Sequence, residues 1–406
     1  MRSNLPGALL ETPDGATAHA QLKACVHCGM CNATCPTFEL TGDELDGPRG
    51  RIWLMKQALE GGEVTRTTQI HLDRCLECRS CETTCPSGVS YHRLLDVARP
   101  FVEARVRRPP GERLARWAIR FVTPHPARFA LVMALGRLVA PLLPASLKSK
   151  LPPKVAHGHV ADTAGASRRM ALLAGCAQSV VAGHFNAATR RVFARASIDL
   201  SETPGAGCCG AVSFHLGAAE EARAFARRNI DAWLAAIDAG SEAVIVNASG
   251  CAAFIQDYGH LLGEDPAYAD KAQRIAALVK DPVQVLETAD LVATRPPADP
   301  RIAVHDPCTL QHGLRLKGRV ATLLERLGYE PQPVRDAHLC CGSAGAYSLL
   351  QPAFANALKA NKLAALNEAA PAAIYTGNIG CWMHLAGAAP TPVRHWIEAV
   401  DEVTAP

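Results

Sequence analysis

Two short runs of cysteine carry the clearest chemistry in this sequence. Each run has the spacing C-x2-C-x2-C-x3-C followed by proline: Cys25, Cys28, Cys31, Cys35 and Pro36 in the first, and Cys75, Cys78, Cys81, Cys85 and Pro86 in the second. Thiolates at this spacing hold pairs of [4Fe–4S] clusters, and the fourth thiolate of each run reaches the cluster of the other. We therefore predict two clusters with crossed ligands: Cys25, Cys28, Cys31 and Cys85 for one, and Cys75, Cys78, Cys81 and Cys35 for the other.

The short gaps between the cysteines have a physical reason. Three thiolates around one small cluster need a tightly turning chain, and two-residue gaps allow this while leaving backbone N–H groups free to donate to sulfur. Pro36 and Pro86 are expected to stop helical continuation and to direct the fourth cysteine away. Zinc knuckles space their cysteine pairs further apart, and a disulfide framework needs an oxidising compartment, so both fit less well.

Composition limits the class of protein. The chain has 406 residues, 16 cysteines and a formal net charge of +4. This length allows two or three domains, and so small a charge gives no argument for a nucleic-acid partner. The first residues contain no apolar signal-like stretch, and no apolar run reaches the length of a membrane span. We expect a cytoplasmic protein that could sit peripherally on the inner membrane without a spanning helix.

The elements that position the cysteine runs are expected to be helical. Residues before about 20 predict a polar tail, residues 46–50 a turn, and residues 51–60 a helix that ends at Gly61 and Gly62. The 39 residues between Cys35 and Cys75 are too many for a minimal ferredoxin. We therefore predict a helical ferredoxin-type domain with both clusters over residues 1–99.

Residues 100–167 predict a basic helical linker. Arginines alternate with apolar residues in its first part, and residues 129–143 are mostly apolar but interrupted by Arg137 and Pro141. Two interpretations stay open. The segment could form amphipathic helices packed on the flanking domains, or a basic amphipathic surface for a membrane or a partner subunit.

From residue 168 onward, short apolar runs alternate with helical patterns, which is typical of α/β domains. Residues 171–174 and 243–246 predict strands, and residues 187–196 and 218–239 predict helices. We assign residues 168–297 to a first cysteine-rich domain and residues 298–406 to a second.

These two domains are expected to be copies of one unit. Cys308, Cys340 and Cys341 each lie 132 residues after Cys176, Cys208 and Cys209, and Cys381 lies 130 residues after Cys251. A repeat in this register predicts two copies packed about a pseudo-two-fold axis. Because ligands gather at the carboxyl ends of parallel strands, the cysteines of each copy should converge on one sheet edge.

Each copy contains a Cys-Cys-Gly turn. Gly210 and Gly342 are expected to have positive φ, because the chain must fold back sharply there. Residues 205–210 also match G-x-G-x-x-G, but the second copy lacks the first two glycines while keeping its cysteines, which argues against a dinucleotide site.

The metal content of the repeated cysteines is left open. A third iron–sulfur cluster, a structural zinc and buried thiols are all compatible with four cysteines per copy. The second copy is preferred as the site (Cys308, Cys340, Cys341, Cys381), and the first copy is less favoured (Cys176, Cys208, Cys209, Cys251). His384, or His305 and His312 beside Cys308, could contribute to the second site, or could be ordinary hydrogen-bonded histidines.

Taken together, the motifs resemble a known family. Tandem cysteine runs followed by two CCG domains are similar to the iron–sulfur subunit of bacterial glycolate oxidase, and residues 24–31, 46–51 and 306–308 carry the likeness most strongly. The chain is similar also to iron–sulfur subunits of anaerobic glycerol-3-phosphate dehydrogenase and of lactate-utilisation complexes, and more distantly to heterodisulfide reductase. The fold implied is α+β multidomain, with an N-terminal α-helical ferredoxin module followed by a duplicated α/β cysteine-rich (CCG) domain pair.

The resemblance implies a division of labour between subunits. A flavin-binding partner would oxidise glycolate to glyoxylate, and this chain would pass the electrons toward a quinone or another membrane acceptor without oxidising substrate alone. It departs from the heterodisulfide reductase pattern, because Phe254 and His384 stand where that pattern has a fifth cysteine. A thiol–disulfide enzyme and a zinc-stabilised docking scaffold are the alternatives from other classes.

Overall fold

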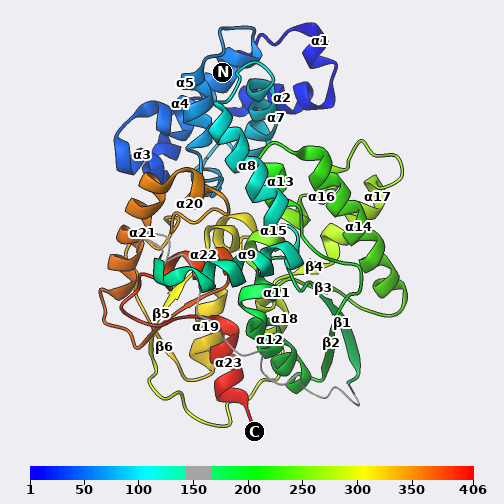
Figure 1. Ribbon diagram of the computed structural model, residues 1–406, viewed down its shortest axis with the longest axis vertical. Coiled ribbons are helices and arrows are strands. Elements are labelled where there is room, and N and C mark those ends of the chain that lie inside the picture. The colour runs from blue at the N-terminus through cyan, green and yellow to red at the C-terminus, as the bar shows by residue number, and fades with distance from the viewer. Residues whose placement is uncertain (143–165) are drawn as a thin grey trace. The chain divides into compact units, whose positions relative to one another are not determined.

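The computed structural model describes residues 1–142 and 166–406, which divide into two compact units. The first comprises Met1–Arg116 and His338–Lys362, and the second comprises Trp117–Ala337 and Leu363–Pro406. Each unit is described by itself below, with the elements labelled in Figure 1. Among the described residues, no helix has both the length and the apolarity needed to cross a bilayer. The predicted linker falls partly outside the described residues, at 143–165.

The first unit is helical, as the sequence predicted. Its elements are α1 (Gly7–Leu10), α2 (Pro13–Ala24), η1 (Met30–Thr34), α3 (Pro36–Thr41), η2 (Glu44–Asp46), α4 (Pro48–Leu59), α5 (Arg66–Asp73), α6 (Ser80–Thr84), α7 (Tyr91–Glu103) and α20 (Tyr347–Leu350). Helices α2 and α4 both pack on α7. Leu22, Met55, Leu59, Leu94 and Leu95 are almost fully buried between them. This core holds the ends of the two cysteine loops.

Three local expectations for this unit were wrong. Residues before 20 form α1 and most of α2, because Thr12 caps α2 by accepting from the Gly15 N–H and Pro13 occupies its first turn. Pro36 opens α3 instead of only stopping a helix, since proline lacks the N–H that a first helical turn leaves unused. Of the turn predicted at 46–50, only Asp46, the last residue of η2, and Gly47 lie outside a helix of the α type, because α4 already begins at Pro48.

Two helices, α8 and α9, follow α7 in the sequence. Helix α8 (Pro110–Val122) contains the boundary between the units, and α9 (Pro126–Leu138) and η3 (Ala140–Leu142) belong to the second. The basic segment forms helices here, and their side chains differ in exposure: Phe129 of α9 is buried, whereas Leu131 and Leu135 are exposed. The choice between amphipathic helices packed on the flanking domains and a basic amphipathic surface for a membrane or a partner subunit stays open.

The second unit contains two parallel sheets of identical order, which confirms the duplicated α/β pattern. The first sheet has the order β2-β1-β3-β4: β1 (Arg168–Leu172), β2 (Ile198–Glu202), β3 (Val244–Ile245) and β4 (Val279–Lys280). The second has the order β6-β5-β7-β8: β5 (Arg301–His305), β6 (Glu330–Gln332), β7 (Ala373–Thr376) and β8 (Val393–His395). All neighbouring strands are parallel.

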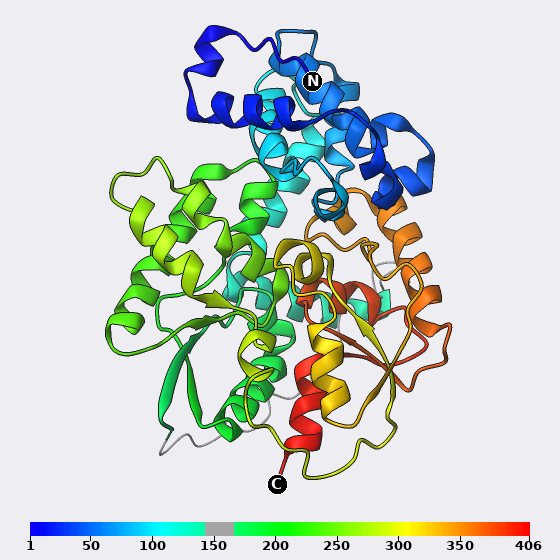
Figure 2. The ribbon, with the colours of Figure 1, turned by 180° about the vertical axis from the view of Figure 1, so that it is seen from behind.

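Helices connect and cover these strands. They are α11 (Gln178–Val181), α12 (Gly183–Arg195), α13 (Ala211–His215), α14 (Ala219–Asp238), α15 (Ser249–Gln256), α16 (Tyr258–Leu261), α17 (Ala269–Leu278), α18 (Val283–Leu286), η4 (Thr309–Gly313), α19 (Arg319–Arg326), α22 (Ile379–Leu385) and α23 (Trp396–Thr404), with α21 (Pro352–Asn367) crossing the unit boundary. The C-terminal helix α23 packs on both α12 and α19, which ties the two copies together (Figures 1 and 2). Arg191 of α12 pairs with Asp401 of α23 at 2.5 Å.

Candidate metal centres

Four predicted ligands line one cavity of the first unit, which we call the first cluster cavity. The cavity has a volume of about 450 Å³. It is lined by Cys25, Cys28, Cys31 and Cys85, and also by Cys81. Three of these cysteines belong to the loop from α2 to η1, and Cys85 follows α6. The structure thus brings the fourth cysteine of the second run to the first run.

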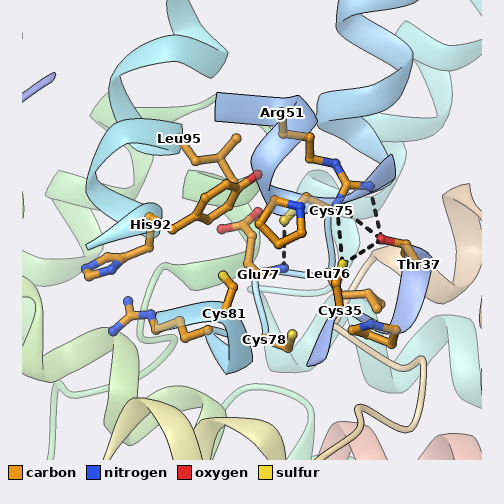
Figure 3. A pocket seen from close by; sticks show the side chains of 14 residues that line it. Cys35, Thr37, Arg51, Cys75, Leu76, Glu77, Cys78, Cys81, His92 and Leu95 are labelled. Atoms are coloured by element: carbon orange, nitrogen blue, oxygen red, sulfur yellow. Dashed lines mark hydrogen bonds between the residues drawn. The ribbon is translucent and has the colours of Figure 1, made fainter. Parts of the chain in front are cut away.

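The other four predicted ligands line a second cavity, which we call the second cluster cavity. It measures about 410 Å³, and Cys35, Cys75, Cys78 and Cys81 lie around it. Figure 3 shows these four side chains about one shared space, with Cys35 arriving from the first run. Pro48, Cys81 and Tyr91 line both cavities, so the two cavities are neighbours.

The thiols in both cavities oppose one another's ionisation. Burial, followed by the nearby Cys25 and Cys85, raises the pKa of Cys31 to about 11. Burial likewise raises the pKa of Cys81 well above its usual value, with Cys78, Glu82, Cys75 and Cys35 adding to the effect. Crowded thiolates of this kind need a cationic partner, and iron–sulfur clusters are held by four cysteine thiolates. The residues present therefore fit such a cluster in each cavity.

Backbone strain repeats at the same positions of the two loops. His27 and Gly29, two and four residues after Cys25, have φ values of 61° and 85°. Glu77 and Arg79, two and four residues after Cys75, have φ values of 54° and 59°. Three of these four residues are not glycine, and such conformations persist only where the surroundings enforce them, typically at ligand sites. The paired strain is consistent with two loops that wrap similar groups.

The first cysteine-rich copy brings its four thiols together within the second unit. Interaction with Cys208, followed by burial, raises the pKa of Cys176 well above its usual value. Cys176, Cys208 and Cys209 are buried, and Cys251 is partly buried. This copy, the less favoured of the two in the sequence, therefore keeps its cysteines as a largely buried group.

The four cysteines of the second copy are divided between the two units. Cys340 and Cys341 belong to the first unit and are buried, whereas Cys308 and Cys381 belong to the second. The Asn378 side-chain amide donates to Cys381 Sγ at 3.7 Å. Of the three histidines considered above, His305 bonds Thr376 Oγ1 at 2.9 Å, His312 lies buried in η4, and His384 lies in α22.

Both Cys-Cys-Gly turns have the expected backbone. Gly210 and Gly342 have φ values of 93° and 87°. In each turn the glycine N–H donates to the Sγ of the first cysteine of the pair at 3.4 Å. The shared geometry confirms the prediction of positive φ at these two glycines.

Phe254 occupies the position at which the heterodisulfide reductase pattern has a fifth cysteine. Its ring is 7% exposed and packs at 5.5 Å from the ring of Phe214, 5.7 Å from His215 and 5.9 Å from Tyr258. The position of the fifth cysteine is therefore taken by a packed aromatic side chain, and Phe254 itself offers no ligating atom.

One group beside the second cluster cavity was missed in the sequence. Arg51 is 1% exposed, and Asp46 and Thr37 next to it are equally buried. Arg51 shares the inward face of α4 with Met55 and Leu59, at spacings of four and eight residues. An arginine on an otherwise apolar helix face is the signal that could have revealed this group.

Comparison with known proteins agrees with this arrangement. A family model described as a 4Fe-4S dicluster domain matches residues 21–89, and one described as a cysteine-rich domain matches residues 170–256 and 302–386. The glycolate oxidase iron-sulfur subunit of Escherichia coli (strain K12) is 49% identical over 402 residues, which cover 99% of each chain. The chain belongs to the family of glycolate oxidase iron–sulfur subunits.

Other members and relatives extend the comparison. The probable glycolate oxidase iron-sulfur subunit of Bacillus subtilis (strain 168) is 30% identical over 90% of this chain and 88% of its own. Lactate utilization protein A of Bacillus licheniformis is 26% identical over 57% of this chain and 99% of its own. As a glycolate oxidase iron–sulfur subunit, the chain is an iron–sulfur protein with an electron-transfer role, and the predicted α+β multidomain fold with a ferredoxin-type module and two CCG domains is confirmed.

Proposed function

We propose that this chain is the electron-transfer subunit of a flavin-dependent glycolate oxidase (glycolate dehydrogenase) complex. In this proposal a flavin-binding partner oxidises glycolate to glyoxylate, and the chain passes the electrons toward a quinone or another membrane acceptor. When bound, [4Fe–4S] clusters supply one-electron reduction and oxidation. The chain's own residues hold the clusters, and the chain alone does not oxidise glycolate.

One observation carries the proposal: each cavity of the first unit is lined by three cysteines of one run and the fourth cysteine of the other. We propose Cys25, Cys28, Cys31 and Cys85 as the ligands in the first cluster cavity and Cys75, Cys78, Cys81 and Cys35 as those in the second. Because the cavities share lining residues, groups held in them would be neighbours, as electron relay requires.

Substrate and partner are inferred from the relatives. The Escherichia coli and Bacillus subtilis proteins are named as iron–sulfur subunits of glycolate oxidase, and a subunit implies other subunits. The more distant relative is named for lactate utilization, so lactate is the competing substrate.

The cysteine-rich copies are proposed as further metal sites, for a third cluster or for zinc. The first copy gains support from the burial of Cys176, Cys208 and Cys209 beside the partly buried Cys251. The second copy, with Cys308, Cys340, Cys341 and Cys381, has a matching Cys-Cys-Gly turn.

The test of this function uses the chain together with its partner subunits, purified anaerobically. Glycolate added to the complex should reduce the clusters of this chain, observed as EPR signals of reduced [4Fe–4S] centres, whereas the chain alone should stay oxidised. Parallel additions of lactate and glycerol 3-phosphate distinguish the competing complexes. An iron-free chain, or glycolate oxidation by the chain alone, would contradict the proposal.

A further inference from the structure

A fully buried cation lies against the second cluster cavity. Arg51 Nη1 is 3.9 Å from Cys35 Sγ, and Arg51 Nε donates to the carbonyl oxygen of His71 at 2.8 Å. Burial disfavours the charged guanidinium, but Cys75, Tyr91, Cys35 and Asp46 more than offset this and raise the pKa of Arg51 above its usual value. The guanidinium is therefore charged at every physiological pH.

The position of this guanidinium is fixed by Thr37. Both terminal nitrogens of Arg51 donate to Thr37 Oγ1 at 3.1 Å, and Thr37 Oγ1 donates to the carbonyl oxygen of Asp46 at 2.7 Å. Figure 3 shows Arg51, Thr37 and Cys35 joined by these contacts at the edge of the cavity. The charge is thus held beside a proposed cluster ligand by hydrogen bonds that need no cluster to form.

Nearby acidic groups do not cancel this charge. Asp46 lies 3.6 Å from Arg51 Nη2, but its other oxygen accepts from Arg74 at 2.9 Å. Two guanidiniums and one carboxylate leave one positive charge, and His71, which bonds Asp46 at 2.8 Å, can only add to it. Glu77 also lines the cavity, but it is paired with Arg99.

Among the described residues that line the first cluster cavity, no buried arginine corresponds to Arg51. The arginine that lines this cavity is Arg49, whose side chain is 36% exposed and pairs with Glu44 at 2.6 Å. The other basic residue there, His27, is partly exposed. The two cavities therefore differ by one buried, uncancelled positive charge.

Resting on the proposed function, we infer that Arg51 raises the reduction potential of the cluster in the second cavity above that of the first. One electron would then leave the first cluster and reside on the second, with no bond broken and no proton moved, since Arg51 keeps its charge throughout. Reduction potentials of iron–sulfur clusters respond to local charge, hydrogen bonds to sulfur and solvent. A charge buried beside the ligands is screened far less than one in water.

Solvent acts in the opposite direction, which makes the inference specific. Cys28 of the first cavity is exposed, whereas the proposed ligands of the second are all buried or partly buried. Water stabilises the extra negative charge of a reduced cluster, so exposure alone would favour the electron on the first. Arg51 is thus the group on which the order of the two potentials depends.

The test is an EPR-monitored redox titration of the full chain, purified anaerobically, with iron content measured for every variant. Arg51→Met should lower one of the two midpoint potentials and leave the other unchanged, reducing the equilibrium preference for the second cluster roughly tenfold or more. Arg51→Lys retains the charge and should remain near wild type. Arg105→Met removes an exposed arginine that stacks on Phe101 and lines neither cavity, and should move neither potential.

Asp46→Asn gives an independent test, because it should shift the reduction potential in the opposite direction. Removal of this carboxylate should raise the potential that Arg51→Met lowers. If Arg51→Met loses iron, the Asp46→Asn variant is the one that tests the inference. Unmoved potentials, equal shifts of both, or a shift in the lower-potential cluster alone would overturn the inference while leaving the proposed function intact. An iron-free wild-type chain would instead overturn the proposed function itself.

Discussion

Replacing Gly342 by alanine tests how the second Cys-Cys-Gly turn is built. A Cβ added at Gly342 would lie 2.7 Å from the carbonyl oxygen of Ala355 and 2.9 Å from Cβ of Leu358. The first of these contacts is with backbone, so no side-chain rotation relieves it. Gly345 provides the matched control: its φ is also positive, at 60°, but nothing lies within 4 Å of an added Cβ.

The expected cost follows from these contacts. A left-handed alanine costs about 1–2 kcal/mol at either position. Overpacking against Ala355 and Leu358 adds about 1–3 kcal/mol at Gly342 alone. Gly342→Ala should therefore be less stable than Gly345→Ala by about 2 kcal/mol, which lowers the midpoint of thermal unfolding by about 4–8 °C.

Differential scanning calorimetry of the anaerobic chain measures this difference. Alkylation followed by mass spectrometry should also show faster modification of Cys340 and Cys341, both 2% exposed, in Gly342→Ala than in Gly345→Ala. Equal melting and equal alkylation of the two variants would refute the reasoning. The left-handed backbone conformation, which both positions share, would then explain both losses, and the contacts with Ala355 and Leu358 would contribute nothing.

Three further predictions concern charge, pH and metal. Arg108→Met should destabilise the chain by about 2 kcal/mol in thermal unfolding, because it removes the 2.5 Å partner of Asp73, whose side chain is 8% exposed, and leaves Arg116 as its remaining partner. A loss no larger than that of exposed Arg105→Met would contradict this. Burial lowers the pKa of His395 from 6.5 to about 4, so its neutral form stabilises the fold above pH 6.5 and this contribution fades as pH falls toward 4. Chemical denaturation should show about 2 kcal/mol lost between pH 7.5 and 5 in wild type but not in His395→Gln, and parallel pH profiles would rule out this role. Cys209→Ser should remove the metal of the first cysteine-rich copy while leaving the iron of the two cluster cavities. Unchanged metal content would mean that the four thiols of this copy hold no metal.

Much of the fold could be read from the sequence because its strongest signals are periodic. The register from Cys176, Cys208 and Cys209 to their second-copy equivalents predicted two copies, and the two sheets have the same strand order. The long helix expected at 218–239 is α14, Ala219–Asp238. Positive φ could also be predicted where a glycine occupies the position, as at Gly210 and Gly342.

What could not be predicted depends on tertiary contacts. Glu77 and Arg79 adopt positive φ, although neither residue type favours that conformation. The apolar face of α4 could have revealed that Arg51 is buried, but its partners, Thr37 and the carbonyl of His71, come from other elements and could not be predicted. Helices α1 and α2 were missed because both are short and α2 has a mixed composition, so that their stability comes from packing of α2 on α7 and of α1 on α2.

Crossed ligation is tested most directly by comparing the EPR spectra of four single variants of the reduced, anaerobic chain. The account predicts that Cys35→Ala loses the same signal as Cys78→Ala, and that Cys85→Ala loses the same signal as Cys28→Ala. If Cys35→Ala instead matches Cys28→Ala, and Cys85→Ala matches Cys78→Ala, each run holds its own cluster and the account is contradicted.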